Sequence, residues 1–399
     1  MSESGFLREG AGRRAAVAVL FAMGLAIALM VVTADGPDAV SGGLGGDYPS
    51  FYAAGDIVGG EVGIDPERFY DPQTQFDAQE PVLPSDSEGN LFFAYPAFFV
   101  APYAALSSLG FVSSYLVHTV LMIGAVLLAF GLLRPCSATI RDHGLETLAV
   151  ALSFYPLFRG VTGGQNTALS LLAFAVIWRS LHDGREVPAG IAAALLLFKP
   201  PLALPVIGLF LLSRRFLALA SVIFTAIGLY AVGAVLTGPS WPSAWADAIR
   251  FLDDVDTPFN VQNFVSLPGS AEAIFGIDST AATVVGFGLA AAVALALSAM
   301  WLRNGHDVDV LVAAAVAGSL LISPHALYYD AGILVLVGLM VADRRPEWRR
   351  WLVVGWAAGL THLAASSLGV DPLVTVVIAA FAFAAMADGR PLLARAAHQ

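Results

Sequence analysis

Long apolar runs separated by short polar stretches dominate the sequence. The runs at 15–33, 111–133 and 216–236 contain no Asp, Glu, Lys or Arg. Each is long enough to cross the roughly 30 Å hydrocarbon core of a bilayer as a helix. A backbone in lipid must satisfy its own hydrogen bonds, so such runs are helical. The pattern therefore predicts an all-α integral membrane protein.

Together with the remaining apolar runs, these three predict a bundle of about twelve transmembrane helices. Several of them are short and are interrupted by Gly or Pro. The expected spans lie near 15–33, 111–133, 145–160, 165–181, 188–199, 201–213, 216–236, 281–302, 309–322, 326–342, 349–366 and 372–388. The first run is longer than the apolar core of a signal peptide and further spans follow it, so we expect it to be retained.

The basic residues set the expected orientation, because Lys and Arg concentrate in cytoplasmic loops. With both termini in the cytoplasm, sixteen of the twenty Lys and Arg residues fall inside. The four on the outer side are Arg68, Arg159, Lys199 and Arg250. Residues 34–110 and about 238–280 then form two outer loops.

The segment 91–110 is apolar enough to cross, but a crossing there would invert every following loop through 216–236. We therefore expect a proline-broken juxtamembrane or re-entrant helix on the outer side. This threading divides the chain into a catalytic transmembrane module, 1–236, and a second part, 237–399, with the second outer loop and the C-terminal helices.

Composition and charge support the membrane assignment. Hydrophobic residues make up 57% of the chain and charged residues 13%, against about 25% charged residues in soluble domains. The first outer loop is strongly acidic, with twelve carboxylates and one base, Arg68, between Asp35 and Glu88. This excludes attraction of nucleic acid through that loop. The single cysteine, Cys136, excludes an internal disulfide and a cysteine metal cluster.

Four polar segments break the apolar pattern on the expected outer face. They are GGDYPSFY at 45–52, RGVTGGQN at 159–166, FKPP at 198–201 and SPHALYYD at 323–330. Irregular backbone at membrane depth is tolerated where it is buried in protein or lines a watery cavity. We expect the four segments to meet at one site.

Three residues in these segments suggest a site for a phosphate or pyrophosphate. Lys199 interrupts an apolar sequence, and a cation inside a bilayer is costly enough to suggest a function. Arg159 and His325 lie on the same expected face, although snorkelling of Arg159 to the interface is an open alternative. No His, Asp or Glu spacing resembles a zinc site, so no cofactor is expected. A divalent ion held by acids of the first outer loop is an open alternative.

Among the loop acids, Asp47 is the candidate general base. It lies about a dozen residues after the first span, between glycines and an aromatic stretch. A general base must sit at the edge of a shielded site, near the hydroxyl that it deprotonates. Asp56, Asp65 and Asp71 are weaker candidates. The Asp-Pro pairs at 65–66 and 71–72 are typical of turns and caps.

The motifs together resemble the GT-C superfamily, and in particular glycosyltransferase family 87. The resemblance rests on DYPSFYAAG with a later RFYD, on FAYP, GGQNTAL and FKPP, and on SPHALYYD, in order from about 47 to 330. Family members commonly have Tyr-Pro-Pro where this chain has Tyr95-Pro96-Ala97, and the Trp-rich second outer loop has no counterpart that we can align. These differences leave the acceptor open.

The resemblance implies an inverting transfer of mannose or arabinofuranose on the extracytoplasmic face. The donor would be a polyprenyl-phosphate sugar and the acceptor a lipid or glycan. Asp47 would be the base, with Lys199, His325 and Arg159 near the donor phosphate. Neighbouring residues of the same motifs would support them, namely Tyr48, Tyr52, Tyr95, Gln165, Asn166 and Tyr328.

The main alternative is a secondary transporter or lipid flippase, since paired short spans broken by Gly or Pro also occur at transporter sites. No expected span carries an acid near its middle, whereas ion-coupled carriers usually need one. A non-catalytic membrane scaffold would leave the four polar segments unexplained. The sequence therefore favours the enzyme.

Overall fold

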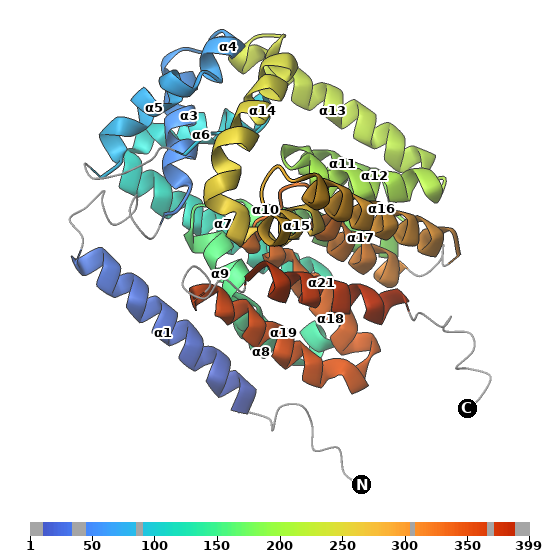
Figure 1. Ribbon diagram of the computed structural model, residues 1–399. Coiled ribbons are helices and arrows are strands. Elements are labelled where there is room, and N and C mark those ends of the chain that lie inside the picture. Colours follow the sequence, from blue (N-terminus) through green and yellow to red (C-terminus); the bar gives the residue numbers. More distant parts are fainter. Residues whose placement is uncertain (1–10, 34–44, 85–90, 304–307, 365–370, 388–399) are drawn as a thin grey trace.

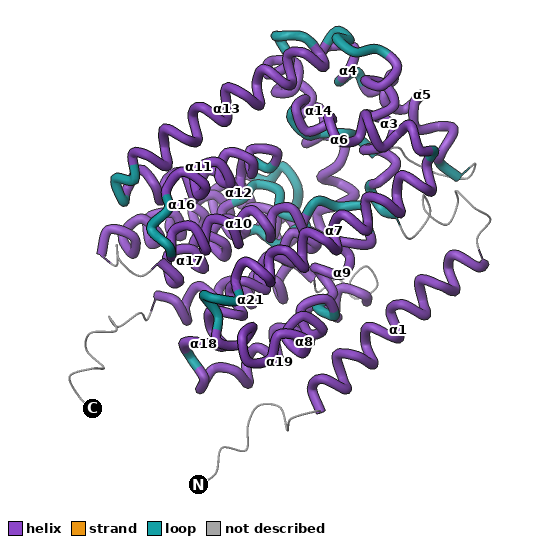
Figure 2. Tube along the Cα trace, turned by 180° about the vertical axis from the view of Figure 1, so that it is seen from behind, coloured by secondary structure: helices purple, strands orange, loops and turns teal. Residues whose placement is uncertain are grey.

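The apolar runs fold into helices in the computed structural model, which describes residues 11–33, 45–84, 91–303, 308–364 and 371–387. The described residues are 84% helix and contain no strand. A single isolated bridge joins Phe264 and Leu327. Figures 1 and 2 show helices lying side by side in a bundle, with α1 along its edge. The all-α prediction is confirmed.

The first third of the chain builds one long helix and a group of short helices. The order is α1 (Ala11–Thr33), α3 (Tyr48–Gly60), α4 (Pro66–Phe69), α5 (Pro72–Gln79), η2 (Glu80–Val82), η3 (Ala97–Val100), α6 (Ala101–Leu106) and η4 (Ser107–Leu109).

The central third is the packed bundle. It contains α7 (Phe111–Leu133), α8 (Ala138–Leu152), α9 (Tyr155–Thr162), α10 (Thr167–His182), α11 (Glu186–Leu195), η5 (Leu196–Phe198), α12 (Pro200–Leu212) and α13 (Phe216–Thr237).

The last third adds the second loop region and the C-terminal helices. These are α14 (Trp241–Asn260), η6 (Val261–Asn263), α15 (Leu267–Phe275), α16 (Thr280–Arg303), α17 (Val308–Ile322), η7 (Tyr328–Ile333), α18 (Leu334–Arg344), η8 (Pro346–Trp348), α19 (Arg349–Leu360), η9 (Thr361–Ala364) and α21 (Asp371–Ala387).

Few of these helices are long enough to cross a bilayer alone. Among the described residues, α7, α13 and α16 are long and apolar enough to cross a membrane. The pair α9 and α10 would make a fourth span, bent by 116°. Other apolar helices, such as α12 and α17, have 13 and 15 residues and reach only about 20 Å at 1.5 Å per residue. The protein is a membrane protein, but the count of about twelve spans is not confirmed.

One expected span is wrong as a continuous helix. The run 145–160 is divided between α8, which ends at Leu152, and α9, which begins at Tyr155. Pro156 occupies the first turn of α9. A proline has no backbone N–H and is accommodated at a helix start, so it fixes the break here.

The apolar segment 91–110 contains only short helices, η3, α6 and η4, and no long helix. It packs tightly on α3, where a Cβ at Gly55 would lie 2.3 Å from the carbonyl oxygen of Tyr103. Two glutamines of α5 hold its beginning: Gln75 accepts from the Phe93 N–H at 2.8 Å, and Gln79 accepts from the Leu91 N–H at 3.0 Å. Its position relative to a membrane stays a prediction.

A polar network joins one end of the bundle. Asp309 at the start of α17 accepts from the Trp178 indole at 2.7 Å and pairs with Arg344 of α18. Asp343 accepts from the Thr139 N–H at 2.7 Å. The network links the ends of α8, α10, α17 and α18.

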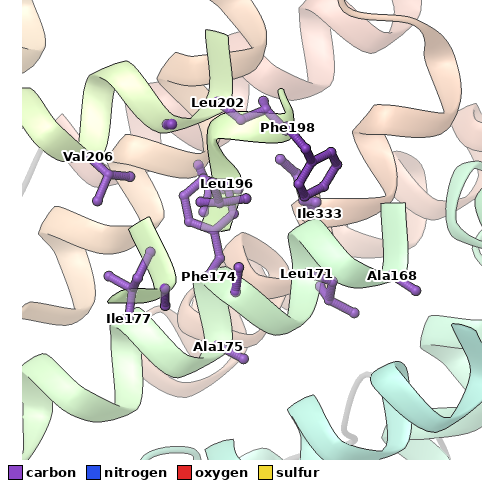
Figure 3. Close-up of a cluster of buried hydrophobic side chains, with 14 of the residues drawn as sticks. Ala168, Leu171, Phe174, Ala175, Ile177, Leu196, Phe198, Leu202, Val206 and Ile333 are labelled. Atoms are coloured by element: carbon purple, nitrogen blue, oxygen red, sulfur yellow. The ribbon is translucent and has the colours of Figure 1, made fainter. Parts of the chain in front are cut away.

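The apolar core lies between α10, η5, α12 and η7 (Figure 3). Leu171, Phe174 and Leu196 are fully buried. Phe198 stacks on Phe99 with the ring centroids 4.4 Å apart and the planes at 9°. This packing ties the 91–110 segment to η5 and fixes the backbone that carries the next residue, Lys199.

Candidate active site

Two glycine-rich turns interlock and set the first part of the site. The Asp47 N–H donates to the Gly163 carbonyl at 3.3 Å. Gly46 and Gly164 have φ of +49° and +69°, a region that favours glycine. A Cβ on Gly164 would lie 2.5 Å from the Gly45 carbonyl oxygen, and one on Gly46 would lie 2.7 Å from the Gly163 carbonyl oxygen. Only glycines allow the two turns to approach this closely.

The interlock brings the Asp47 carboxylate to Gln165. The Gln165 side-chain amide donates to Asp47 Oδ2, and the Tyr329 hydroxyl donates to the same oxygen at 3.4 Å. The Tyr95 hydroxyl donates to Gln165 Oε1 at 3.4 Å. Burial raises the pKa of the Tyr95 phenol, so it stays protonated and can donate. Asp47 itself is half-buried.

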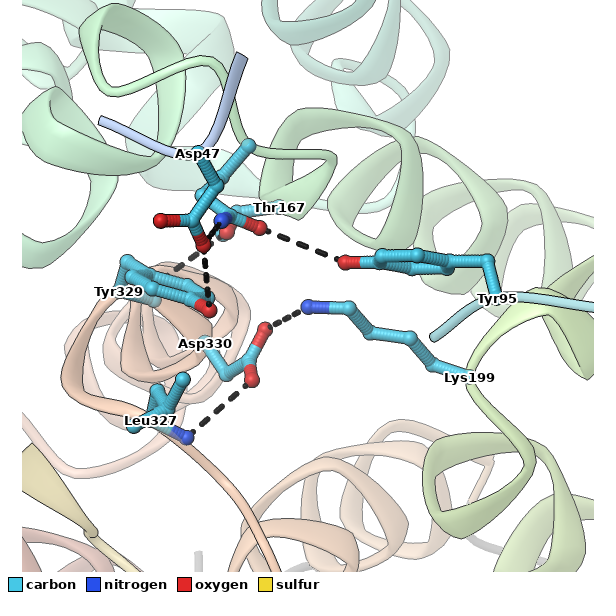
Figure 4. Close-up of polar contacts among 8 residues, drawn as sticks. Asp47, Tyr95, Thr167, Lys199, Leu327, Tyr329 and Asp330 are labelled. Atoms are coloured by element: carbon cyan, nitrogen blue, oxygen red, sulfur yellow. Dashed lines mark hydrogen bonds and ion pairs between the residues drawn. The ribbon is translucent and has the colours of Figure 1, made fainter. Parts of the chain in front are cut away.

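Lys199 and Asp330 form a buried ion pair beside Asp47 (Figure 4). The Lys199 ammonium lies 2.5 Å from Asp330 Oδ1, and both side chains are nearly buried. Asp330 Oδ2 accepts from the Leu327 N–H at 3.3 Å. The ammonium is 5.2 Å from the centroid of the Tyr329 ring and 6.0 Å from that of Tyr95. Lys199 stands at the break between η5 and α12, where Pro200 begins the next helix.

All four polar segments therefore contribute to one cluster. They supply Asp47, Gln165, Lys199 and the Tyr329–Asp330 pair, with Tyr95 from the 91–110 segment. Thr167 completes it, since its hydroxyl donates to the Tyr329 carbonyl at 3.2 Å. In Figure 4 the side chains of Asp47, Tyr95, Lys199 and Tyr329 point toward one another.

The other two expected phosphate-binding residues, Arg159 and His325, lie among aromatic side chains. The Arg159 guanidinium packs against the turn at Gly163 and Gly164, where a Cβ on Gly163 would lie 3.3 Å from Nη2. It also interacts with the phenols of Tyr328, Tyr155 and Tyr115. His325 is exposed, with its ring 5.2 Å from the ring of Phe264. Both residues thus pack against aromatic side chains.

The expected supporting residues divide into three groups. Tyr95 and Gln165 belong to the cluster itself. Tyr48 and Asn166 are fully buried behind the interlocked turns. Tyr52 lies against Phe111, with the ring centroids 5.2 Å apart, and Tyr328 stacks on His362 at 3.9 Å. Tyr52 and Tyr328 thus lie at the periphery of the cluster.

Sequence reasoning named Tyr329 and Asp330 only as members of the SPHALYYD segment and missed them as site residues. The available signal was an acid, Asp330, within the expected span 326–342. Among the described residues no group of three or more His, Cys, Asp or Glu is placed to hold a metal ion.

The interlock itself can be tested with Gly164→Ala. We expect overpacking against Gly45 and Tyr48 to lower the free energy of unfolding by about 1–3 kcal/mol. The matched control is Gly184→Ala, since Gly184 has a φ of +71° but no atom within 4 Å of the place that a Cβ would occupy. Thermal unfolding in detergent would compare them. Equal stability of the two variants would show that the turns do not depend on close approach.

Comparison with known families gives one match. The model described as glycosyltransferase family 87 matches residues 93–324, which is more than half of the chain. The matched range includes Tyr95, Gln165 and Lys199, while Asp47 precedes it and Asp330 follows it. No curated protein and no solved structure matches the chain.

Proposed function

The chain belongs to glycosyltransferase family 87, and from this premise we propose that it moves a sugar from a polyprenyl-phosphate donor to a lipid or glycan hydroxyl. The sugar is mannose or arabinofuranose in this proposal. Membership in a glycosyltransferase family makes the protein a transferase and removes the support for a transporter. One observation carries the finer proposal. The Asp47 carboxylate and the Lys199 ammonium both lie next to Tyr329.

In the proposed reaction the acceptor O–H loses its proton to the Asp47 carboxylate. The acceptor oxygen forms a bond to the anomeric carbon from the face opposite the phosphate. The bond between that carbon and the phosphate oxygen breaks, and its electron pair leaves with the polyprenyl phosphate. The anomeric configuration is inverted. Gln165 and Tyr329 support the base by donating hydrogen bonds to its carboxylate and so hold it in one orientation.

Lys199 is the proposed partner of the leaving phosphate. An ammonium has three N–H donors, and one of them is directed at Asp330. The others can donate to a phosphate oxygen, and a fixed cation stabilises the charge that develops there. Arg159 and His325 are proposed as outer contributors to the donor head group, since each lies on a segment that borders the cluster.

A donor assay tests this function. The purified protein in lipid nanodiscs would receive radiolabelled polyprenyl-phosphate mannose, polyprenyl-phosphate arabinofuranose or the nucleotide sugars, together with a membrane lipid extract as acceptor. We expect labelled product with a polyprenyl-phosphate sugar and none with the nucleotide sugars. Transfer from nucleotide sugars alone would contradict the proposed donor class.

The orientation is also part of the proposal, with both termini cytoplasmic and the site on the extracytoplasmic face. In a Cys136→Ser background, a cysteine at the exposed Ser243 of α14 should react with an impermeant maleimide added outside intact cells. A cysteine at the exposed Asp142 of α8 should react only after permeabilisation. The reverse labelling pattern would overturn the threading.

A further inference from the structure

A histidine that the proposed reaction does not use lies directly behind the interlocked turns. His118 belongs to α7 and is 1% exposed. The ring of Tyr48 covers it at 5.0 Å and the ring of Tyr103 at 5.9 Å, measured between centroids. Burying an imidazole without a hydrogen-bond partner costs free energy. Its presence here therefore calls for a role.

Tyr103, whose ring lies against His118, also contacts the side chain of Asn166, which is fully buried. Asn166 Oδ1 accepts a hydrogen bond from the Tyr103 hydroxyl at 2.6 Å. Within the described ranges, both imidazole nitrogens and Asn166 Nδ2 lack a partner in full hydrogen-bond geometry. His118 and Asn166 therefore form no hydrogen bond with each other in this structure. Hydrogen bonds at catalytic sites are often long without substrate and tighten in the complex.

Tyr48 and Asn166 directly follow the proposed base, Asp47, and its partner, Gln165, in the chain. Asn166 follows Gln165, which donates to Asp47. Tyr48 follows Asp47 and shares a hydrogen bond of 2.5 Å with Ser114 of α7. Ser114 and His118 are four residues apart on α7, and residues at this spacing lie on one helix face. That face therefore contacts Tyr48, the residue after Asp47, through both Ser114 and His118.

The same helix also fixes the second turn through its backbone. The Tyr115 hydroxyl donates to the Thr162 carbonyl at 2.6 Å, immediately before Gly163. Displacement of reacting groups by about 1 Å can cost 10²-fold in rate. A rigid wall behind the turns is thus a requirement of the proposed chemistry.

We propose that His118 is a positioning residue, which bonds Asn166 when substrate is bound and so holds Gln165 and Asp47 in the reactive geometry. The inference rests on the proposed function. His118 does not touch substrate, and its effect is on turnover rather than on donor binding.

The test compares His118→Phe with His118→Gln. Phenylalanine fills the space but cannot bond Asn166, whereas glutamine can. We expect His118→Phe to lower kcat about tenfold with donor KM unchanged, as loss of one hydrogen bond in the transition state would do. His118→Gln should recover most of that loss. Met122→Leu, one turn further along α7 and also buried, is the packing control and should keep wild-type kcat.

Tyr103→Phe gives an independent variant if a change at His118 prevents folding. It removes the hydroxyl that bonds Asn166 and keeps the ring, so kcat should again fall with KM unchanged. Wild-type kcat in His118→Phe or in Tyr103→Phe would overturn the proposal, as would equal impairment of His118→Phe and His118→Gln. A wild-type protein without transfer activity would instead reject the proposed function.

Discussion

Asp47→Asn is expected to lower turnover by about 10²–10⁴-fold, the usual contribution of a general base. Asparagine has nearly the same shape, and its side-chain oxygen can still accept from Gln165 and Tyr329, which bond Asp47 in the structure. The change therefore removes basicity while the interlocked turns remain. Donor KM should stay close to the wild-type value, because the phosphate is proposed to bind at Lys199. Steady-state kinetics with a polyprenyl-phosphate sugar would measure both quantities.

Two other acids of the same loop serve as controls for that experiment. Asp56 is exposed on α3, and Asp71 caps α5 by accepting from the Thr74 N–H at 2.8 Å. Asn at a cap position is as good as Asp, so Asp56→Asn and Asp71→Asn should both retain turnover. Near-normal turnover in Asp47→Asn, with an active donor and acceptor, would place the base elsewhere.

Lys199→Ala is expected to impair donor use by about tenfold or more, because charge-assisted contacts to phosphate are stronger than neutral hydrogen bonds. It should also leave the buried Asp330 carboxylate uncompensated. Breaking a buried ion pair from one side costs about 3–5 kcal/mol, so a large fall in thermal stability should accompany the kinetic defect. Kinetics and thermal unfolding must therefore be measured together.

A double variant separates these two effects. Lys199→Met with Asp330→Leu replaces both charges by apolar groups of similar length, and such replacements of buried pairs are often neutral or stabilising. We expect this variant to recover stability but not donor use. Recovery of donor kinetics in the double variant would show that Lys199 maintains the fold and does not bind phosphate.

The third variant is His325→Ala. His325 is exposed, and its ring lies against Phe264. If His325 binds the donor phosphate, the variant should raise donor KM without the loss of stability expected for Lys199→Ala. Unchanged donor kinetics in both Lys199→Ala and His325→Ala would contradict the proposed phosphate site.

The sequence alone determined the fold class, the family and most helix positions. An uncharged apolar run bounded by polar or helix-breaking residues is a local signal, and the expected span 111–133 coincides with α7. The expected span 201–213 differs from α12, Pro200–Leu212, by one residue at each end. The family prediction is confirmed by the match over 93–324, because the short motifs and their order are properties of the chain itself.

Only the tertiary structure decided which polar residues of each segment meet. Asp47 and Gln165 are 118 residues apart, and Lys199 and Asp330 are 131 apart. The hydrophobic pattern says that a helix is buried but not which neighbour covers it, so it could not distinguish Gln165 from Arg159 or Asp330 from His325. The choice follows from the close approach that Gly46 and Gly164 permit and from the packing of η5 and η7 against α10, which are properties of the assembled bundle.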